Sequence, residues 1–168
     1  YDENSLDIYN SFFRSKNLSF KNKSFINLKP FLDVNSEFEV QDVDVEIFKQ
    51  LEIDKLLKSK NILKQINTKN VVKFNSKKFS RSFFDKLNLK FDLAYGRLNY
   101  SKKIFIKDDV IKCNGNVNLL DEFPLLSFDC SINFENKRDL LKKFKIDNKK
   151  DNKNFNLNVK GGLSILNQ

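Results

Sequence analysis

The stretch KLNLKFDLAY, residues 86–95, carries an apolar side chain at every second position and mostly polar or charged side chains between them. The same alternation runs through LLSFDCSINF at 125–134 and FNLNVKGGLSIL at 155–166. Because successive side chains of a β-strand point to opposite faces, each stretch describes a strand with one apolar and one polar face. The sequence therefore predicts a mainly β protein of the α+β class, built on a long, curved, antiparallel sheet with one apolar face.

Further strands are expected on the N-terminal side of these stretches. Apolar residues that favour a first strand and a short return are Leu6, Ile8 and Phe12, then Leu18 and Phe20. The alternation over 32–40 changes parity before Val43, Val45 and Ile47, which predicts a β-bulge. In the C-terminal part, strands are expected over 86–100 with a break at Gly96, and over 104–120, 125–134 and 155–166. Strands of roughly 10 to 15 residues would span about 35 to 50 Å.

The hydrophobic period changes between residues 47 and 66. Apolar residues recur there at steps of three and four, at Phe48, Leu51, Ile53, Leu56, Leu57, Ile62, Leu63 and Ile66. This spacing is typical of an amphipathic helix. We expect one helix, or two short ones interrupted near 59–61, that packs on the sheet or closes its end; a partner-binding helix is the alternative. A short basic helix is expected over 138–146, and a loose connection over 71–84.

The turn around Asp121 and Glu122 predicts the register of one hairpin. If Leu120 faces Phe123, then the pairs are Val117 with Leu126, Gly115 with Phe128, Cys113 with Cys130 and Ile111 with Ile132. A slip of one residue would set apolar against polar faces and is disfavoured, whereas a slip of two stays open. The two cysteines are then either a cross-strand disulfide or two small buried hydrophobic residues.

Composition limits the classes of function. The chain has 168 residues and a net charge of +9, but only four of its 31 basic residues are arginines. An excess of Lys, Asn, Ile and Phe is what an AT-rich genome produces, and few arginines disfavour reading of bases in nucleic acid. Without any histidine, a Ser-His-Asp triad, a Cys-His pair and the common zinc sites are excluded within this segment.

No group of residues predicts catalysis, a metal or a cofactor. Neighbouring acids at Asp108 with Asp109 point to opposite faces of a strand, and those at Asp121 with Glu122 lie in a turn. Asp42 and Asp44 share a face without a third ligand nearby. The four glycines form no phosphate-binding loop, and Gly115 and Gly161 replace side chains on the apolar stripes, where a bend or a close backbone approach is expected.

The length suits a single domain with no internal boundary. Since the chain begins at Tyr1 and stops soon after an unfinished alternating run, we expect residues 1–168 to be one segment of a larger β-rich protein. No stretch approaches the roughly 18 to 20 apolar residues that cross a bilayer.

The order of strands and turns resembles a known family. The segments that carry the resemblance are 89–93, 96–100, 104–110, 113–119, 126–134 and 156–165. Their repeated strand-turn-strand pattern is similar to that of the AsmA-like superfamily and covers 86–134 and 155–166. The resemblance implies an envelope protein of Gram-negative bacteria, anchored in the inner membrane through parts of the parent chain, with a periplasmic, curved sheet whose groove carries phospholipid or supports outer-membrane assembly. It implies no catalytic residue.

On this hypothesis the chain is not an enzyme, and its apolar side chains line a groove for phospholipid acyl chains. The expected lining residues are Leu87, Leu89, Phe91, Leu93, Val117, Leu119, Leu126, Phe128, Ile132, Phe134, Leu157, Val159, Leu163 and Ile165. Cys113 and Cys130 are the possible disulfide. The first alternative is a sheet that only scaffolds other envelope proteins, and the second is a basic module that binds nucleic acid.

Overall fold

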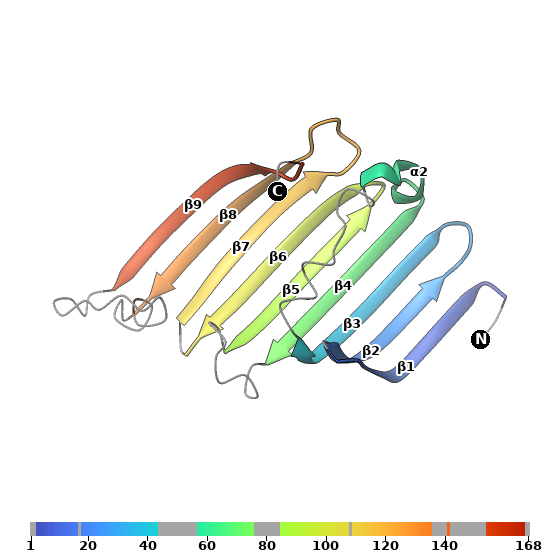
Figure 1. Ribbon diagram of the computed structural model, residues 1–168, viewed down its shortest axis with the longest axis horizontal. Coiled ribbons are helices and arrows are strands. Elements are labelled where there is room, and N and C mark those ends of the chain that lie inside the picture. The colour runs from blue at the N-terminus through green and yellow to red at the C-terminus, as the bar shows by residue number, and fades with distance from the viewer. Residues whose placement is uncertain are drawn as a thin grey trace.

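The computed structural model describes residues 3–16, 18–43, 57–75, 85–107, 109–135, 141 and 154–166. Nine strands form one sheet in chain order, so that sequential strands lie side by side in a single layer (Figure 1). They are β1 Ser5–Arg14, β2 Leu18–Asn27, β3 Leu32–Val43, β4 Ile66–Asn75, β5 Lys86–Ala94, β6 Arg97–Ile106, β7 Asp109–Asn118, β8 Leu125–Phe134 and β9 Phe155–Ser164. The prediction of a mainly β chain is therefore confirmed.

One pair of strands corrects the predicted topology. All neighbours are antiparallel except β3 and β4, which are parallel and pair from Leu32 with Ile66 to Val40 with Phe74. The sheet is therefore mixed, whereas the sequence predicts a purely antiparallel one. Alternation of apolar residues predicts which face a side chain joins but not the direction of a strand. Parallel neighbours need a crossover connection, and here it ends in the helical residues before β4.

Helix is scarce in the described part of the chain. The helix α2 covers Lys60–Leu63, Leu57 and Lys58 are also helical, and Ser59 interrupts them. This agrees with the predicted interruption near 59–61, but the helix ends before Ile66, which begins β4. Residues 47–56 of the predicted helix lie outside the described residues. So does the helix expected over 138–146, apart from Leu141, which is helical.

The loose connection expected over 71–84 is wrong in its first part, because β4 runs to Asn75. Its alternating positions include Thr68 and Asn70 between Ile66 and Val72, so the apolar pattern that announces the other strands is diluted. The remainder, 76–84, lies outside the described residues.

Bulges shape the N-terminal strands. In β1 the register shifts between Ile8 and Ser11, where Asn10 has a φ of 51°. In β3 the pairing with β2 shifts so that Asp42 pairs with Ser19 and Val40 with Phe20, which leaves Gln41 as the extra residue. The parity change predicted before Val43 is thus confirmed, while Val45 and Ile47 lie outside the described residues. The return strand β2 has 10 residues and is longer than predicted.

The predicted strand 104–120 is wrong as a single element. The hairpin β5–β6 turns at Tyr95 and Gly96 as expected, but β6 continues to Ile106, and β7 starts at Asp109. Lys107, with a φ of 54°, lies in the turn between them. The missed signal is a change of parity from Ile104 and Ile106 to Ile111. The bounds of β8 agree with the prediction, and β9 ends two residues earlier than predicted.

A small core lies at one end of the sheet, where α2 lies (Figure 1). Leu57 and Leu63 from the helical segment are buried together with Val117 and Leu119. Half-buried residues packed against them are Leu93, Leu98, Leu120, Leu126 and Ile165. The Lys60 ammonium also donates to the carbonyl oxygens of Leu120 (3.0 Å) and Asp121 (3.3 Å). These contacts hold α2 against the β7–β8 turn.

Candidate functional site on one face of the sheet

Strand pairing shows which side chains share a face, because directly paired residues of neighbouring strands point to the same side. We call face A the side that carries Leu89, Phe91 and Leu93 of β5, and face B the side that carries Lys90 and Asp92. The pairs on face A between β5 and β6 are Leu87 with Ile104, Leu89 with Lys102, Phe91 with Tyr100 and Leu93 with Leu98. Each row can be followed across the sheet in this way.

The ladders carry these rows through β7, β8 and β9. Leu98 pairs with Val117, Tyr100 with Gly115, Lys102 with Cys113 and Ile104 with Ile111. From β7 to β8, Gly115 pairs with Phe128, Cys113 with Cys130 and Ile111 with Ile132, so the predicted register of this hairpin is confirmed. In β9, Leu163, Gly161, Val159 and Leu157 lie opposite Leu126, Phe128, Cys130 and Ile132. The expected lining residues that belong to strands therefore fall on one face.

Their exposure differs along the sheet. Half-buried members are Leu87, Leu89, Phe91, Leu93, Leu126, Phe128 and Ile132. Leu157, Val159 and Leu163 on β9 are exposed by 38% to 47%. Phe134 is buried, with 2% of its surface exposed. The open part of face A thus runs from the centre of β5 to the edge strand β9.

The end of face A next to α2 is occupied by the protein itself. Val117 and Leu119 are 3% and 5% exposed and pack against Leu57 and Leu63, and Ile165 packs at the same place. Leu119 and Ile165 lie beyond the strands, where their amides donate to the carbonyls of Gly96 (2.8 Å) and Pro124 (3.3 Å). Two of the expected lining residues, Val117 and Leu119, are therefore core residues of the sheet end, and Leu93, Leu126 and Ile165 pack against this core while half-buried.

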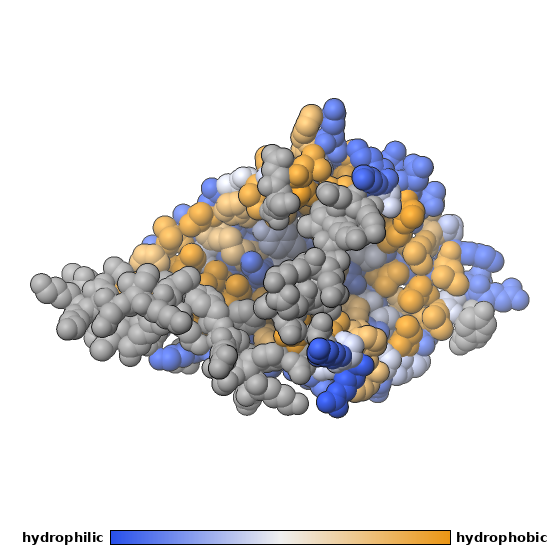
Figure 2. Space-filling view, in the orientation of Figure 1, coloured by the Kyte–Doolittle hydropathy of each residue, from blue (hydrophilic) through white to orange (hydrophobic). Residues whose placement is uncertain are grey.

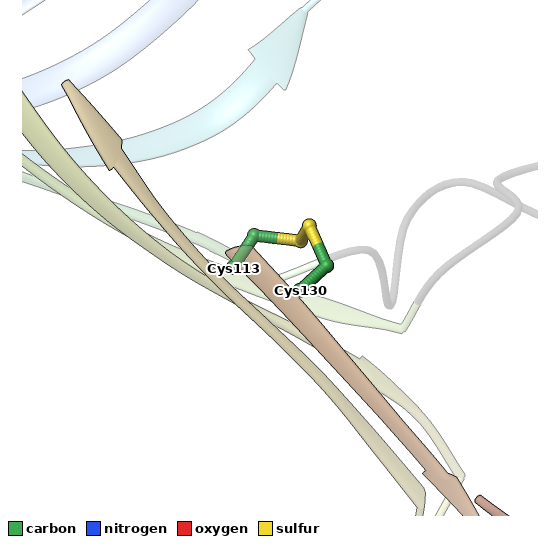
Figure 3. Close-up of a disulfide and its surroundings, with 2 residues drawn as sticks. All are labelled: Cys113 and Cys130. Atoms are coloured by element: carbon green, nitrogen blue, oxygen red, sulfur yellow. A yellow bond between two sulfur atoms is a disulfide. The ribbon is translucent and has the colours of Figure 1, made fainter. Parts of the chain in front are cut away.

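A disulfide crosses the middle of face A. Cys113 and Cys130 are direct cross-strand partners, with an S–S distance of 2.18 Å and 4.0 Å between their Cα atoms. Figure 3 shows both side chains rising from the same side of the sheet. Of the two alternatives left open by the sequence, the structure has the oxidised one. The bond joins β7 to β8 between the row of Phe128 and the row of Ile132.

Two glycines make room for aromatic rings on face A. A Cβ on Gly115 would meet the Ser127 carbonyl oxygen and lie 2.5 Å from Cε1 of Tyr100. A Cβ on Gly161 would lie 2.7 Å from Cζ of Phe128. Each ring therefore leans over the glycine of the next strand, as predicted from the absence of side chains on the stripes. The space above the two glycines on face A is therefore filled by the Tyr100 and Phe128 rings.

Sequence reasoning missed the contribution of β6. Leu98, Tyr100, Lys102 and Ile104 lie on face A, between the rows of β5 and β7. The parity of the apolar residues reverses at both ends of β6, from Leu93 to Leu98 and from Ile106 to Ile111, so this strand did not continue either of the predicted stripes. Burial raises the pKa of the Tyr100 phenol. Lys102 is half-buried and is the one charged side chain in the four paired rows of β5–β9 on this face.

The N-terminal half of face A is polar in its centre. The pairs that continue the row of Phe91 are Asn70 with Ser36, Ser36 with Ser24 and Ser24 with Ile8. Ser24 Oγ donates to Asn22 Oδ1 (2.9 Å) and so accepts from Ser36 Oγ (2.7 Å). Asn70 Nδ2 donates to Thr68 Oγ1 (2.8 Å). Asn22, Ser36 and Asn70 are 7% to 8% exposed, so buried hydroxyl and amide groups fill this centre.

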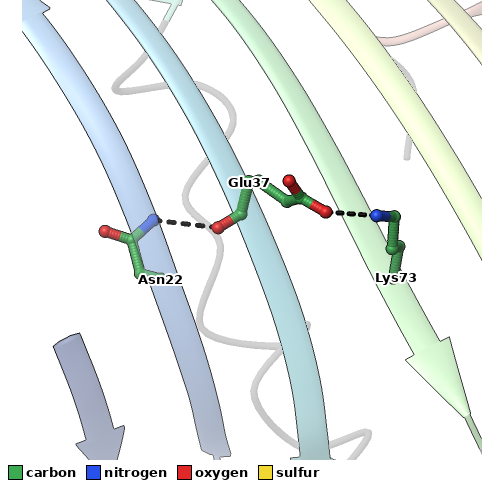
Figure 4. A network of polar contacts seen from close by, with 3 residues as sticks. All are labelled: Asn22, Glu37 and Lys73. Carbon is green, nitrogen blue, oxygen red and sulfur yellow. Dashed lines mark hydrogen bonds and ion pairs between the residues drawn. The ribbon is translucent and has the colours of Figure 1, made fainter. Parts of the chain in front are cut away.

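Face B carries most of the described charges of the strands. On β3 the Glu37 carboxylate pairs with the Lys73 ammonium of β4, and the carbonyl of Glu37 accepts a hydrogen bond from Asn22 Nδ2 (3.3 Å) (Figure 4). The bond and charge of Lys73 lower the pKa of Glu37. On β8 and β9, Asp129 pairs with Lys160 at 2.8 Å and raises the pKa of that lysine. Both pairs are exposed and bridge adjacent strands.

Two of the neighbouring acids considered above, Asp109 and Asp121, accept hydrogen bonds within the fold. Asp109 Oδ1 accepts from the amide of Glu135 (2.7 Å), and Asp121 Oδ1 accepts from Asn118 Nδ2 (2.6 Å). Asp44, Asp108 and the side chain of Asp42 lie outside what the structure describes. Among the described residues, no three potential ligands gather as a metal site would require. Within the same residues, no helix has the length and hydropathy of a membrane span.

Hydrophobic side chains gather in two areas on the side of the molecule seen in Figure 2. One area lies over β8 and β9 and the other over β2 and β3.

Comparisons of the chain with protein-family models, with curated proteins and with solved structures find no match.

Proposed function

We propose that this chain is a non-enzymatic segment of an envelope protein, and that face A of β5–β9 forms part of a groove for lipid acyl chains. By its resemblance to AsmA-like proteins, it would act in the periplasm, in phospholipid transport between the inner and outer membranes or in outer-membrane assembly. The parent protein would be anchored in the inner membrane.

The observation that carries this proposal is the alignment of apolar residues across five consecutive strands. Three rows of partners run unbroken from β5 to β9, and a fourth consists of Leu93, Leu98 and Val117 on β5–β7 and of Leu126 with Leu163 on β8 and β9. Most members of these rows are apolar while the opposite face is polar. A row of half-buried side chains retains surface for a ligand. Apolar contact contributes roughly 25 cal/mol per Å² removed from water, so an acyl chain on such a surface is stabilised along its whole length.

The exposed fractions of the side chains reduce the set of residues that are expected to line the groove. Val117 and Leu119 belong to the core with α2, Leu93, Leu126 and Ile165 pack against that core, and Phe134 is buried. The centre of the proposed groove is therefore formed by Leu89, Phe91, Tyr100, Phe128 and Val159. The rings that lean over Gly115 and Gly161 provide an aromatic floor, which suits flexible acyl chains.

Lys102 gives the proposed groove a polar contact. It lies between Leu89 and Cys113 in the paired rows, with the Tyr100 side chain on the same face. An ammonium in apolar surroundings favours an anionic group as its partner, which the phosphate of a phospholipid supplies. Lys103 on β6 is one residue further and on face B, where Lys112 lies opposite. It is the matched control: Lys102→Gln should reduce retained anionic lipid, and Lys103→Gln should not.

The test is lipid co-purification. Phe91→Asp and Phe128→Asp place a charge in the centre of the lining, whereas Phe25→Asp places it on face B of β2, where Phe25 is 43% exposed. We expect extracted lipid, quantified by mass spectrometry, to fall strongly in the first two variants and to stay at the wild-type level in the third. Circular dichroism and thermal unfolding report whether each variant folds. A folded wild-type protein that retains no lipid would contradict the proposal.

A scaffold that pairs with other envelope proteins is the second candidate, and the edge strand β9 favours it. Eight residues of β9 between Asn156 and Leu163 are exposed, and its outer edge has no partner strand in the described sheet. Such an edge can accept an added strand. Lys160→Pro would block that pairing without touching the rows of β5–β8. Loss of a protein partner with lipid retained would favour the scaffold.

A further inference from the structure

Large apolar side chains are exposed at one end of the sheet. This end, which we call the turn end, comprises the β2–β3 turn, α2, the β5–β6 turn and the β7–β8 turn. The exposed fractions are Leu28 48%, Phe31 55%, Ile62 57%, Tyr95 57%, Phe123 75%, Leu125 57% and Leu166 40%. At the opposite end, the comparably exposed large apolar residues of the described chain are Phe12 (55%) and Phe13 (47%) on β1 and Leu157 (42%) on β9. The two ends of the strands therefore differ.

The turn tips carry aromatic residues where turns ordinarily carry small polar ones. Tyr95 has a φ of 50° in a tight turn with Gly96. A bulky residue in this left-handed region is uncommon, and Asn, Asp or Gly would adopt it at lower cost. The two-residue hairpin turn itself requires this conformation, and Lys107 adopts it at the opposite end with a φ of 54°, so the feature that distinguishes Tyr95 is its exposed ring. Phe31 and Phe123 occupy the neighbouring turns, and all three rings face solvent by more than half.

The β2–β3 turn and the α2 segment of this end carry lysines and no acids, whereas the β7–β8 turn carries the exposed Asp121 and Glu122. The segments LKPFL at 28–32 and LKSKNILKQI at 57–66 contain four lysines and no acidic residue. The two segments lie together, since Leu28, Phe31 and Ile62 line a common cavity of about 520 Å³. Lys29 and Lys64 are exposed and directly precede Pro30 and Gln65, which line this cavity. Lys58 instead lines the neighbouring cavity with the exposed acids Asp121 and Glu122 of the β7–β8 turn, so the positive charge is concentrated around Lys29 and Lys64. The patch thus combines exposed aromatic and aliphatic groups with positive charge.

We propose that the turn end docks on the surface of a lipid bilayer that contains anionic lipids. Exposed aromatic and aliphatic side chains at turn tips would enter the headgroup region, and the lysines would meet the negative headgroups. A second cavity of about 620 Å³ lies between α2 and the β7–β8 turn and carries both lysines and acids, so it does not select an anionic partner. The exposed rings project from the separate turns that hold Phe31, Tyr95 and Phe123, which fits a broad bilayer surface better than a compact protein partner. This docking goes beyond the groove on face A and does not depend on it.

The test measures sedimentation with vesicles. Wild-type protein should bind vesicles of phosphatidylcholine mixed with phosphatidylglycerol, and binding should weaken as salt increases and be far weaker on pure phosphatidylcholine. Phe31→Asp should weaken binding about tenfold, since it removes an inserted apolar group and adds a repelled charge. Phe12→Asp is the matched control, because Phe12 has the same exposure of 55% at the other end. It should bind as wild type does.

A second pair of variants separates this patch from total charge. Lys29→Gln with Lys64→Gln and Lys103→Gln with Lys112→Gln remove the same charge, but the second pair lies on face B. Binding should fall in the first double variant alone. Equal losses in both, equal losses for Phe31→Asp and Phe12→Asp, or no binding of wild-type protein would overturn the proposal. Phe91→Asp should leave vesicle binding unchanged. The groove proposal and the docking proposal can therefore be rejected independently of each other.

Discussion

The centre of face A is filled by polar side chains on β1–β4 and by apolar side chains on β5–β9. In β1–β4 the central positions are Ser24, Ser36 and Asn70, which are joined to their neighbours by side-chain hydrogen bonds. In β5–β9 the same rows hold aromatic residues, glycines and a disulfide. Hydrogen-bonded groups satisfy one another and leave little for a ligand. The apolar half has no such internal satisfaction, and this is the half where we place the acyl chains.

The disulfide is the largest difference between the halves that can be removed by itself. Its two residues are separated by 17 positions, and closing a loop of that size stabilises a protein by about 3 kcal/mol. We expect a reductant to lower the free energy of unfolding by about this amount in urea titrations. The Cys113→Ala and Cys130→Ala double variant is the control and should not respond to reductant. An equal response of both proteins would show that the disulfide is not what the reductant changes.

Glycine substitutions sharpen the comparison further, because all four glycines lie after residue 95. In Gly115→Ala the new methyl group meets a carbonyl oxygen and the Tyr100 ring, and we expect a loss of about 2 kcal/mol. Gly161→Ala meets only the Phe128 ring and should cost about 1 kcal/mol. Gly162→Ala is the control, because it meets the flexible side chain of Leu125 at 3.0 Å. Chemical denaturation measures all three, and an inverted order would contradict the leaning rings.

The polar half gives a smaller effect. Ser36→Ala removes the hydrogen bond to Ser24 but leaves the bond from Ser24 to Asn22 intact. We expect a loss of about 1 kcal/mol in the free energy of unfolding. Ser131→Ala on face B of β8 is the control and should stay within about 0.5 kcal/mol of wild type. If the two variants lose the same free energy of unfolding, the hydrogen bonds in the polar centre do not stabilise the protein.

The exposed ion pair of Glu37 and Lys73 should contribute least to the free energy of unfolding. Lys73→Ala is expected to cost less than about 0.5 kcal/mol, because exposed pairs are screened by water and salt. Lys73 lowers the pKa of Glu37, so this contribution is present at neutral pH and is lost as the pH falls through that lowered pKa. Unfolding curves of wild type and Lys73→Ala should therefore converge in acid. A difference that grows as the pH falls would contradict the assignment.

The sequence predicted the C-terminal half better than the N-terminal half for a physical reason. Strict alternation at 86–94 and 125–134 defined β5 and β8, and matching apolar partners fixed the register of Cys113 with Cys130. In β4 the polar residues Thr68 and Asn70 occupy positions of face A. The alternation of apolar residues is therefore interrupted, and the strand could not be recognised from it. The parallel pairing of β3 with β4 could not be predicted, because periodicity carries no direction.

The candidate site was predicted only in part. The stripes identified strand residues that share face A, but periodicity could not tell which of them α2 would cover. Val117 and Leu119 were therefore included although they are core residues. Lys102 was missed because a lysine does not contribute to an apolar stripe, and because the parity of the apolar residues reverses at both ends of β6. Burial and the path of a crossover connection are properties of the folded chain, and a pattern along the sequence does not contain them.

The most direct measurement of the central claim is photo-crosslinking with a phospholipid that carries a reactive group in its acyl chain. Peptide mapping should locate adducts on face A of β5–β9, at residues such as Phe91, Tyr100 and Phe128, and few on β1–β4 or face B. Adducts spread equally over both halves, or concentrated around Phe25 on face B, would contradict the account.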